Sequence, residues 1–544
     1  MFAGTIAPAE AMAPRDFGVA AFMYMNTGHL SEILPCAVLP VPGTRPRLCL
    51  VNRSIPTRNL TRTHTRVLAA TAAVALAAAA LIGSGPAHAA TSVGPVGSAS
   101  TGSSLAITVH PNQLGNQLHA GFIGLSFGAA TVAQDNYAST DLGGYLRTLG
   151  RTGVIRVGGN SGDTTFWTST GETAPSWATG GTITPEKLQH LAAIVKSAGW
   201  KVILAVNLEH PDAARAADEA TYARKIFGRS LLAIEIGNEP NFYYSTVSAY
   251  YTDFESYVAA IEKAAPGVGI TGPDAETNHS SWLGGFAALD AGHPDVTEVT
   301  DHTYPTSACG TSTATIPELL GTASVQYETA NAQAAVSAAA QLGVPAAMTE
   351  TNSTVCAGTT GVSDAFASAL WALDYSLLIA QQGIVNADFM GGTNAAGCDP
   401  YTPLCPTTGD LTPRPIYYGL LATELVGTGR FAAVDNPDAA DMRAYAVRQG
   451  HRLTVVLDDV QDPAANGAAT VTLNLGGGFH SGQLTALTTS SSAGLSATTD
   501  ITLGGQQVGE HGAFPRPHST SVRVHGHTAT VTVPAGSAAI IQFN

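Results

Sequence analysis

From about residue 120 onward, short apolar runs alternate with segments of helical periodicity. Continuous apolar runs are typical of parallel strands that are buried on both faces. Eight such runs predict strands, at 121–127, 154–159, 201–207, 231–237, 268–272, 296–302, 345–350 and 384–390. Eight strand–helix units over about 300 residues favour the α/β class, as a (β/α)8 TIM barrel rather than an open doubly wound sheet. No G-x-G-x-x-G motif follows the first strand, which argues against a dinucleotide-binding fold.

Helix boundary signals lie between these runs. Thr184 and Pro185 predict a helix that begins with an N-cap and a proline in its first turn. Ser363 and Asp364 predict the opening of another helix, FASALWALDYSLLIAQQ (366–382), which Gly383 closes.

After about residue 430 the pattern changes to short strands of alternating apolar and polar residues between turns rich in Gly, Asn and Ser. This pattern predicts an antiparallel β-sandwich over 430–544. A short alternating strand near the beginning of the mature chain, within 104–116, is expected to join its sheet. Residues 117–429 would then form the barrel, and the small residues of 90–103 predict a flexible linker.

The first 89 residues contain the pattern of an export signal. Four arginines between 53 and 66 precede an apolar run at 67–82, and Ala87-His88-Ala89 is a small-residue cleavage site. The apolar run is short for the roughly 20 residues that cross a bilayer. We therefore expect a secreted protein, cleaved near Ala89, with no membrane segment in its mature form. Residues 1–50 lack any such pattern, which points to a true start near Val51.

The charge balance excludes several classes of partner. Beyond residue 89 the chain has 18 basic and 37 acidic side chains, a net charge of −19. Nucleic acids and anionic membranes require a basic face, so neither is an expected partner. A heavily sulfated polymer is a poor match for the same reason. The sequence sets no expectation for the oligomeric state.

Four cysteines follow the export segment: Cys309, Cys356, Cys398 and Cys405. An even number in an exported protein indicates two disulfides, with three possible connectivities. Metal binding is the alternative, but no C-x-x-C pair or neighbouring histidine supports it. The first two cysteines follow the sixth and seventh strands, and the last two share the loop after the eighth. We therefore expect the pairs Cys309–Cys356 and Cys398–Cys405.

Two glutamates lie at the ends of predicted strands. Glu239, in I-G-N-E-P, closes the fourth strand, and Glu350, in M-T-E-T-N, ends the seventh. In a TIM barrel both would lie at the C-terminal mouth, where such enzymes keep their catalytic groups. Two carboxylates can flank a glycosidic bond, one as an acid of raised pKa and the other as nucleophile. A lone glutamate at a strand end is usually solvated or salt-bridged, but the N-E-P tripeptide together with the second T-E favours catalysis.

These motifs resemble a known family of enzymes. The stretches EIGNEPNFY (235–243) and TETNS (349–353) are similar to those of the clan A retaining glycosidases. Within that clan the resemblance is to glycoside hydrolase family 79, of β-glucuronidases and heparanases. It covers roughly 104–544, and the other stretches that carry it are IRVGGNSGD (155–163), DHTYP (301–305), GVSDAFASALWALDY (361–375), PIYYG (415–419) and AGSAAIIQF (535–543).

The resemblance implies roles for individual residues. Glu239 would be the acid/base and Glu350 the nucleophile, with neither cofactor nor metal. Asn238 would hydrogen-bond the sugar 2-hydroxyl, and Tyr304 would steady the nucleophile unless it is a core residue. Residues Asn160, Asp163 and Asn207 would line or support the sugar pocket, although the first two are equally suited to order a Gly-rich turn. His302 is expected to support the barrel, because the two-carboxylate mechanism needs no imidazole.

Two positions depart from the family pattern, and both concern the sugar that is bound. The first strand often ends S-F-E in the family, but here Phe127 is followed by Gly128; the eighth often ends N-F-H, but here Phe389 is followed by Met390. These changes leave specificity for glucuronate open. Backbone N–H groups and a phenol could still bind a sugar carboxylate, from Gly391, Gly392 and Tyr401.

The leading prediction is a secreted retaining exo-β-glucuronidase that acts on a glucuronide-containing carbohydrate. Three alternatives stay open. An endo-acting, heparanase-like enzyme is disfavoured by the acidic chain. A retaining glycosidase with non-uronate specificity would explain the two departures. A carbohydrate-binding protein with an inactive barrel is disfavoured because both glutamates are present.

Overall fold

The structure, a computed structural model, describes residues 23–26, 29–32 and 103–544, except for 293–294, 392–397 and 408–409. The chain divides into two units, residues 1–92 and 93–544. The first unit contains a short antiparallel pair, β1 (Met23–Asn26) and β2 (His29–Glu32). The rest of the expected export segment, its cleavage site, and residues 90–102 of the expected linker lie outside the described residues. Within the described residues no helix is long and apolar enough to cross a bilayer.

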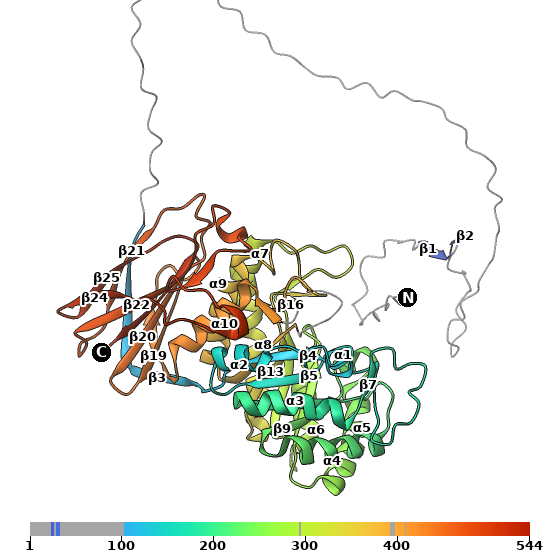
Figure 1. The fold of residues 1–544 in the computed structure, drawn as a ribbon. Coiled ribbons are helices and arrows are strands. Elements are labelled where there is room, and N and C mark those ends of the chain that lie inside the picture. Colours follow the sequence, from blue (N-terminus) through green and yellow to red (C-terminus); the bar gives the residue numbers. More distant parts are fainter. Residues whose placement is uncertain (1–22, 27–28, 33–102, 293–294, 392–397, 408–409) are drawn as a thin grey trace, which may run out of the picture. The chain divides into compact units, whose positions relative to one another are not determined.

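Eight parallel strands form a closed barrel in the second unit (Figure 1), which confirms the predicted TIM-type fold. Every strand lies at one of the eight apolar runs, and the pairing of the last strand with the first closes the ring. The side chains are buried along almost the whole length of each strand, as expected for strands covered on both faces. The strands are β4 (Ile123–Gly128), β5 (Val154–Gly158), β8 (Lys201–Val206), β9 (Leu231–Ile236), β10 (Gly269–Ala275), β11 (Glu298–Thr303), β13 (Ala346–Thr351) and β15 (Ile384–Met390).

Helices follow the barrel strands and cover their outer face (Figure 1). Helix α3 (Pro185–Ala198) begins after Thr184, as predicted. Helix α9 (Phe366–Gln382) has the predicted bounds and ends at Gly383, but Ala365 is its N-cap and Asp364 does not cap it. Asp364 instead accepts a hydrogen bond from the N–H of Gly361 and pairs with Arg414, so its carboxylate is not free to cap the helix. The other helices are α1 (Ala129–Gln134), α2 (Leu142–Leu149), α4 (Ala213–Phe227), α5 (Val247–Ala264), α6 (Ser281–Asp290), α7 (Ile316–Leu319), α8 (Thr322–Leu342) and α10 (Pro415–Val426).

Three short strand pairs lie in the loops that follow the barrel strands. They are β6 (Thr165–Trp167) with β7 (Gly181–Ile183), β12 (Thr306–Ser307) with β14 (Thr354–Val355), and β16 (Leu404–Thr407) with β17 (Asp410–Pro413). Both predicted disulfides are present. Cys309–Cys356 joins the loops after β11 and β13, with Cα atoms 5.3 Å apart, and Cys398–Cys405 lies within the loop after β15.

The predicted C-terminal β domain is confirmed, with two differences from the expected antiparallel sandwich. Its strands form one sheet that closes on itself through a pairing of β22 with β26, and the N-terminal strand β3 runs parallel to β21. The sequence pattern did not predict β22, because its threonines, glycine and alanine do not alternate clearly. The strands are β3 (Ser104–Leu118), β18 (Gly429–Asp435), β19 (Met442–Gln449), β20 (Arg452–Asp459), β21 (Ala469–Asn474), β22 (Ser481–Thr489), β23 (Ile501–Leu503), β24 (Thr520–His525), β25 (Thr528–Val533) and β26 (Ser537–Phe543).

The β domain packs against α9 and α10 through a shared apolar core. Residues 366–380 of α9 are buried throughout, so this helix lies between the barrel and the β domain. Asp374 of α9 accepts hydrogen bonds from Arg443, at 3.3 Å, and from the hydroxyl of Tyr445, at 2.5 Å, both on β19. Because these polar groups satisfy one another inside an apolar contact, the two parts of the unit form one continuous interior.

Candidate active site

Glu239 and Glu350 lie together at the C-terminal mouth of the barrel. Glu239 follows β9 with left-handed backbone angles, φ 44° and ψ 54°, and its N–H donates to the carbonyl of Asp274. Glu350 lies within β13. Both side chains are buried, at 5% and 7% exposure. One carboxylate oxygen of each lies within 4.8 Å of the other and of a ring nitrogen of His302. Non-glycine residues with positive φ often occur at functional sites, where the surrounding structure holds them.

Both oxygens of Glu350 accept hydrogen bonds. Tyr304 donates its hydroxyl to Oε1 at 2.8 Å, and Nη1 of Arg156 donates to Oε2 at 2.7 Å. Burial alone would raise the pKa of Glu350, but the charges of His302 and Arg156 and these hydrogen bonds outweigh it, so the pKa is lowered. Glu350 is therefore held in its ionised form.

The pKa of Glu239 is shifted in the opposite direction. Burial raises the pKa of Glu239, although the hydrogen bond and charge of His302 oppose the effect. Nδ1 of His302 lies 3.0 Å from Oε1 of Glu239, and its other ring nitrogen lies 3.6 Å from Asp274. The imidazole therefore connects Glu239 to a second buried carboxylate, which is more than the supporting role that the sequence predicted. Two neighbouring carboxyl groups with pKa values shifted in opposite directions are the arrangement that acid and nucleophile require.

Arg156, on β5, is a site residue that sequence reasoning missed. Its side chain is fully buried and donates to Glu235 at 2.5 Å and to Oδ1 of Asn238 at 2.7 Å, in addition to Glu350. A Cβ on Gly158 would stand 2.5 Å from the guanidinium carbon, so the first glycine of the G-G-N-S stretch makes room for this arginine. The sequence did contain a signal for this pair. Arg156 and Glu235 are charged residues inside two apolar strand runs, IRVGG and LLAIEIG, and a charge buried in such a strand needs a partner of opposite charge.

The two glutamates line a cavity of about 700 Å³ at the barrel mouth. Of the residues that the sequence placed in the sugar pocket, Asn160, Tyr304, Gly391 and Tyr401 also line it. Asn238 lies beneath the cavity, where Nδ2 donates to Asn160 at 3.1 Å. Other lining residues that were not predicted include Ser161, Phe242, Glu276, Thr306, Ser307 and Asp399.

The remaining predicted pocket residues lie elsewhere. Nδ2 of Asn207 donates to the carbonyls of Gly162 and Asp163, at 3.0 and 2.8 Å, so this amide holds the turn after β5 instead of facing the cavity. The Asp163 carboxyl does not line the cavity either, and burial raises its pKa to about 8. The expected N–H donor of Gly391 is already used, because it donates to the carbonyl of Ser126 at 3.1 Å. Gly392 lies outside the described residues.

The acidic groups at the mouth could in principle hold a metal ion, since Glu239, His302 and Glu350 converge within 4.8 Å. The positive guanidinium of Arg156 already occupies one oxygen of Glu350, and Tyr304 donates to the other. A cation at this point would compete with both donors and would be repelled by the arginine. The described residues at the mouth therefore fit a pair of carboxyl groups in different protonation states better than a metal centre.

Comparison with known proteins supports the family resemblance. Residues 444–540 match the family model for the glycosyl hydrolase family 79 C-terminal beta domain. Among curated proteins, none matches this chain by sequence. A solved structure of a 4-O-α-L-rhamnosyl-β-D-glucuronidase from Fusarium oxysporum is similar with a TM-score of 0.64 and 21% identity, covering 80% of this chain and 100% of that one. A family 51 arabinofuranosidase from Xanthomonas axonopodis is similar with a TM-score of 0.59 and 13% identity, over 81% and 100% of the two chains. At these identities the likeness to solved structures is one of fold.

Proposed function

We propose that this chain, a glycoside hydrolase that resembles family 79, hydrolyses β-linked glucuronic acid with retention of configuration. The observation that supports the retaining mechanism is that one carboxyl oxygen of Glu239 lies within 4.8 Å of one carboxyl oxygen of Glu350. Retaining enzymes hold their two carboxyl groups about 5–5.5 Å apart, whereas inverting enzymes leave about 6.5–9.5 Å for a water molecule. The spacing therefore favours direct attack by one carboxylate on the sugar.

In the first step Glu350 attacks the anomeric carbon, while Glu239 gives its proton to the glycosidic oxygen as that bond breaks. The product is a sugar ester of Glu350 and a free aglycone alcohol. In the second step Glu239, now ionised, takes a proton from a water molecule that displaces Glu350 from the anomeric carbon. Tyr304 and Arg156 hold Glu350 ionised and aimed, and the raised pKa of Glu239 keeps its proton available. Asn238, whose Nδ2 carries a second hydrogen, is proposed to reach the sugar 2-hydroxyl.

The assignment of glucuronic acid is supported by the family resemblance and by one feature of the cavity. Tyr401 lines the cavity next to Tyr304, with ring centroids 6.5 Å apart, and its hydroxyl has no hydrogen-bond partner among the described residues. A phenol in this state can donate to a sugar carboxylate. The volume of about 700 Å³ is that of a small-molecule site, which supports removal of a terminal unit over cleavage within a polymer.

One observation favours a second candidate, a retaining β-glycosidase for an uncharged sugar. The described residues lining the cavity include the carboxyl groups of Glu276 and Asp399 but no Lys, Arg or His. The segment 392–397, which follows Gly391, adds no basic side chain. A uronate would therefore bind without an ion pair, and its own charge would face two further carboxyl groups.

Export of the mature chain is also proposed. It is supported by two disulfides in the structure, because disulfides persist in oxidising compartments outside the cytosol.

A panel of aryl β-glycosides tests the proposal: glucuronide, 4-O-methylglucuronide, galactoside and xyloside. Preference for the two uronides supports glucuronidase activity, and preference for the neutral sugars supports the second candidate. Glu350→Gln should be inactive on every substrate. Glu239→Gln should still form the sugar ester from an activated aryl glycoside, and azide should restore turnover by replacing water. Glu186→Gln, on the exposed first turn of α3, is the matched control and should retain full activity; rescue of neither variant by azide would refute the two roles.

A further inference from the structure

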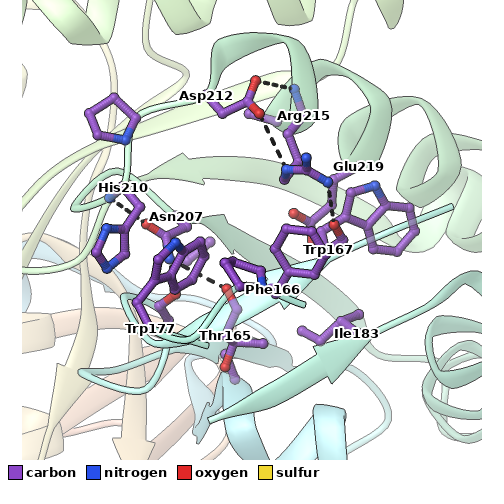
Figure 2. A pocket seen from close by; sticks show the side chains of 16 residues that line it. Thr165, Phe166, Trp167, Trp177, Ile183, Asn207, His210, Asp212, Arg215 and Glu219 are labelled. Atoms are coloured by element: carbon purple, nitrogen blue, oxygen red, sulfur yellow. Dashed lines mark hydrogen bonds and ion pairs between the residues drawn. The ribbon is translucent and has the colours of Figure 1, made fainter. Parts of the chain in front are cut away.

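Figure 2 shows a second cavity, which has a volume of about 430 Å³. It is lined by the segment between β5 and α3 and by the segment from β8 into α4. The two cavities adjoin at 128–130 and 161–162, because Ala129 and Gly162 line this one while Gly128, Ala130 and Ser161 line the other. We call the second cavity the aromatic pocket.

Aromatic side chains and one imidazole ring form the walls of the aromatic pocket. Trp177 and His210 stack with centroids 4.1 Å apart and planes 19° from parallel, and Phe166 meets Trp177 edge to face at 5.9 Å. Figure 2 shows these rings around the pocket, with Trp167 and Ile183 at its far side. Trp177 and His210 are only partly buried. A partly exposed tryptophan face is suited to an amphipathic ligand, because the ring buries apolar surface without closing the pocket to water.

One carboxyl group in the pocket has no hydrogen-bond partner among the described residues. The carboxyl group of Glu219, on α4, is 5% exposed and lines the cavity, yet it has no hydrogen bond to any described residue. Burial first, and then the charge of Asp218, raise the pKa of Glu219 to about 8, with Arg215 opposing the shift. At neutral pH the group is therefore an uncharged acid, which can donate one hydrogen bond and accept others. A ligand hydroxyl could both accept from and donate to this group.

Several other polar groups at the pocket are already engaged. The indole N–H of Trp167 donates to Asp218 at 2.8 Å, and Arg215 donates to the carbonyl of Trp167 at 2.9 Å and to Glu172 at 2.6 Å. Asn207, as described above, holds the neighbouring turn. These contacts build the pocket. Among the described residues they leave the carboxyl group of Glu219, the indole N–H of Trp177 and the ring nitrogens of His210 free to contact a ligand.

The charges around the pocket decide which ligand class it can take. Arg215 pairs with the carboxylates of Glu172 and Asp212, and Asp218 accepts from Trp167, so three carboxylates face one cation and an anionic ligand would be repelled. A cationic ligand is disfavoured for another reason, since the Arg215 guanidinium already lies over the face of Phe166, 4.3 Å from its centroid. An uncharged ligand with an apolar face and several hydroxyl groups fits what remains.

We infer that the aromatic pocket binds a neutral sugar unit joined to the unit that is cleaved between Glu239 and Glu350, with its ring against Trp177 and a hydroxyl group on Glu219. The inference rests on the proposed function, because it extends the same substrate by one sugar. The substrate is then a mixed glycan, in which the cleaved unit carries a neutral neighbour.

The test compares a short substrate with two extended ones. The short substrate is nitrophenyl β-glucuronide; the extended ones are the same glucuronide with a neutral sugar on O4, and a disaccharide of glucuronic acid β-linked to galactose. We expect Trp177→Ala and Glu219→Met to lower kcat/KM about tenfold for one of the extended substrates and less than about twofold for the short one. Glu219→Gln should restore most of the loss, because an amide can also donate and accept. Glu186→Gln, on the exposed first turn of α3 and outside both cavities, is the control and should have little effect on any substrate.

Three results would overturn the inference. Equal losses on short and extended substrates would show a structural role for Trp177 and Glu219. Unchanged values for both extended substrates would show that the pocket binds no part of them. Quenching of tryptophan fluorescence by choline, but not by methyl galactoside or methyl rhamnoside, would show a site for cations. The fluorescence titration needs no turnover, so it separates failure of the pocket from failure of the proposed reaction.

Discussion

Replacement of Tyr304 by phenylalanine should move the acidic limb of the pH–activity profile toward neutral pH. The hydroxyl of Tyr304 donates to Oε1 of Glu350 at 2.8 Å, and without it that oxygen has no donor among the described residues. Arg156 still donates to the other oxygen, so Glu350 stays in place. A hydrogen bond to a charged group is worth about 1.5–3 kcal/mol. At 1.36 kcal/mol for each pKa unit, the loss should raise the pKa of Glu350 by roughly 1–2 units.

The direction of the effect follows from the lowered pKa of Glu350. The nucleophile must be ionised, so activity is present above its pKa and is lost as the pH falls through it. A higher pKa in the Tyr304→Phe variant therefore means that activity is lost at a higher pH, while the basic limb, which reports Glu239, stays in place.

The assay is kcat/KM for an aryl β-glycoside as a function of pH, which reports the ionisations of the free enzyme. The matched control is Tyr401→Phe, which removes a phenol from the same cavity but not from Glu350. Its acidic limb should coincide with that of the unmodified enzyme. An acidic limb that moves by less than about 0.3 units in Tyr304→Phe, or by the same amount in both variants, would refute the account of how Glu350 is kept ionised.

Three further predictions concern stability. Arg156→Ala leaves the buried carboxylates of Glu235 and Glu350 without their partner. The free energy of unfolding, measured in urea, should fall by about 3–5 kcal/mol. A fall of less than about 1 kcal/mol would contradict the pairing. Replacing Cys309 and Cys356 by serine removes a disulfide that links positions 47 residues apart beside the cavity. The free energy of unfolding, measured by thermal denaturation, should fall by about 2–4 kcal/mol. An unchanged melting temperature would contradict this prediction. A chain that ends at residue 429 exposes the buried face of α9 and should be insoluble or inactive, and a soluble active barrel would show that the β domain is an independent module.

Local patterns were enough to predict the barrel, because buried parallel strands appear as separate apolar runs. The same patterns placed Glu239 and Glu350 at strand ends. Parallel strands share one direction, so both side chains had to lie at one mouth of the barrel.

Contacts across the barrel could not be predicted in this way. Arg156 reaches Glu235 and Glu350 from a different strand, and its partners depend on the stagger of the strands and not on spacing in the sequence. The aromatic pocket was missed for a similar reason, since Trp177 and His210 come from loops after different strands and become neighbours only in the folded chain. The closed form of the β domain depended on β22, whose weak alternation gave no signal.

The stereochemistry of the first product tests the central claim most directly. Proton NMR during rapid hydrolysis of an aryl β-glycoside identifies the anomer that is released before mutarotation. The approach of Glu239 and Glu350 to within 4.8 Å predicts that the β-anomer appears first and the α-anomer only later. Initial release of the α-anomer would contradict the two-step mechanism and the assignment of Glu350 as its nucleophile.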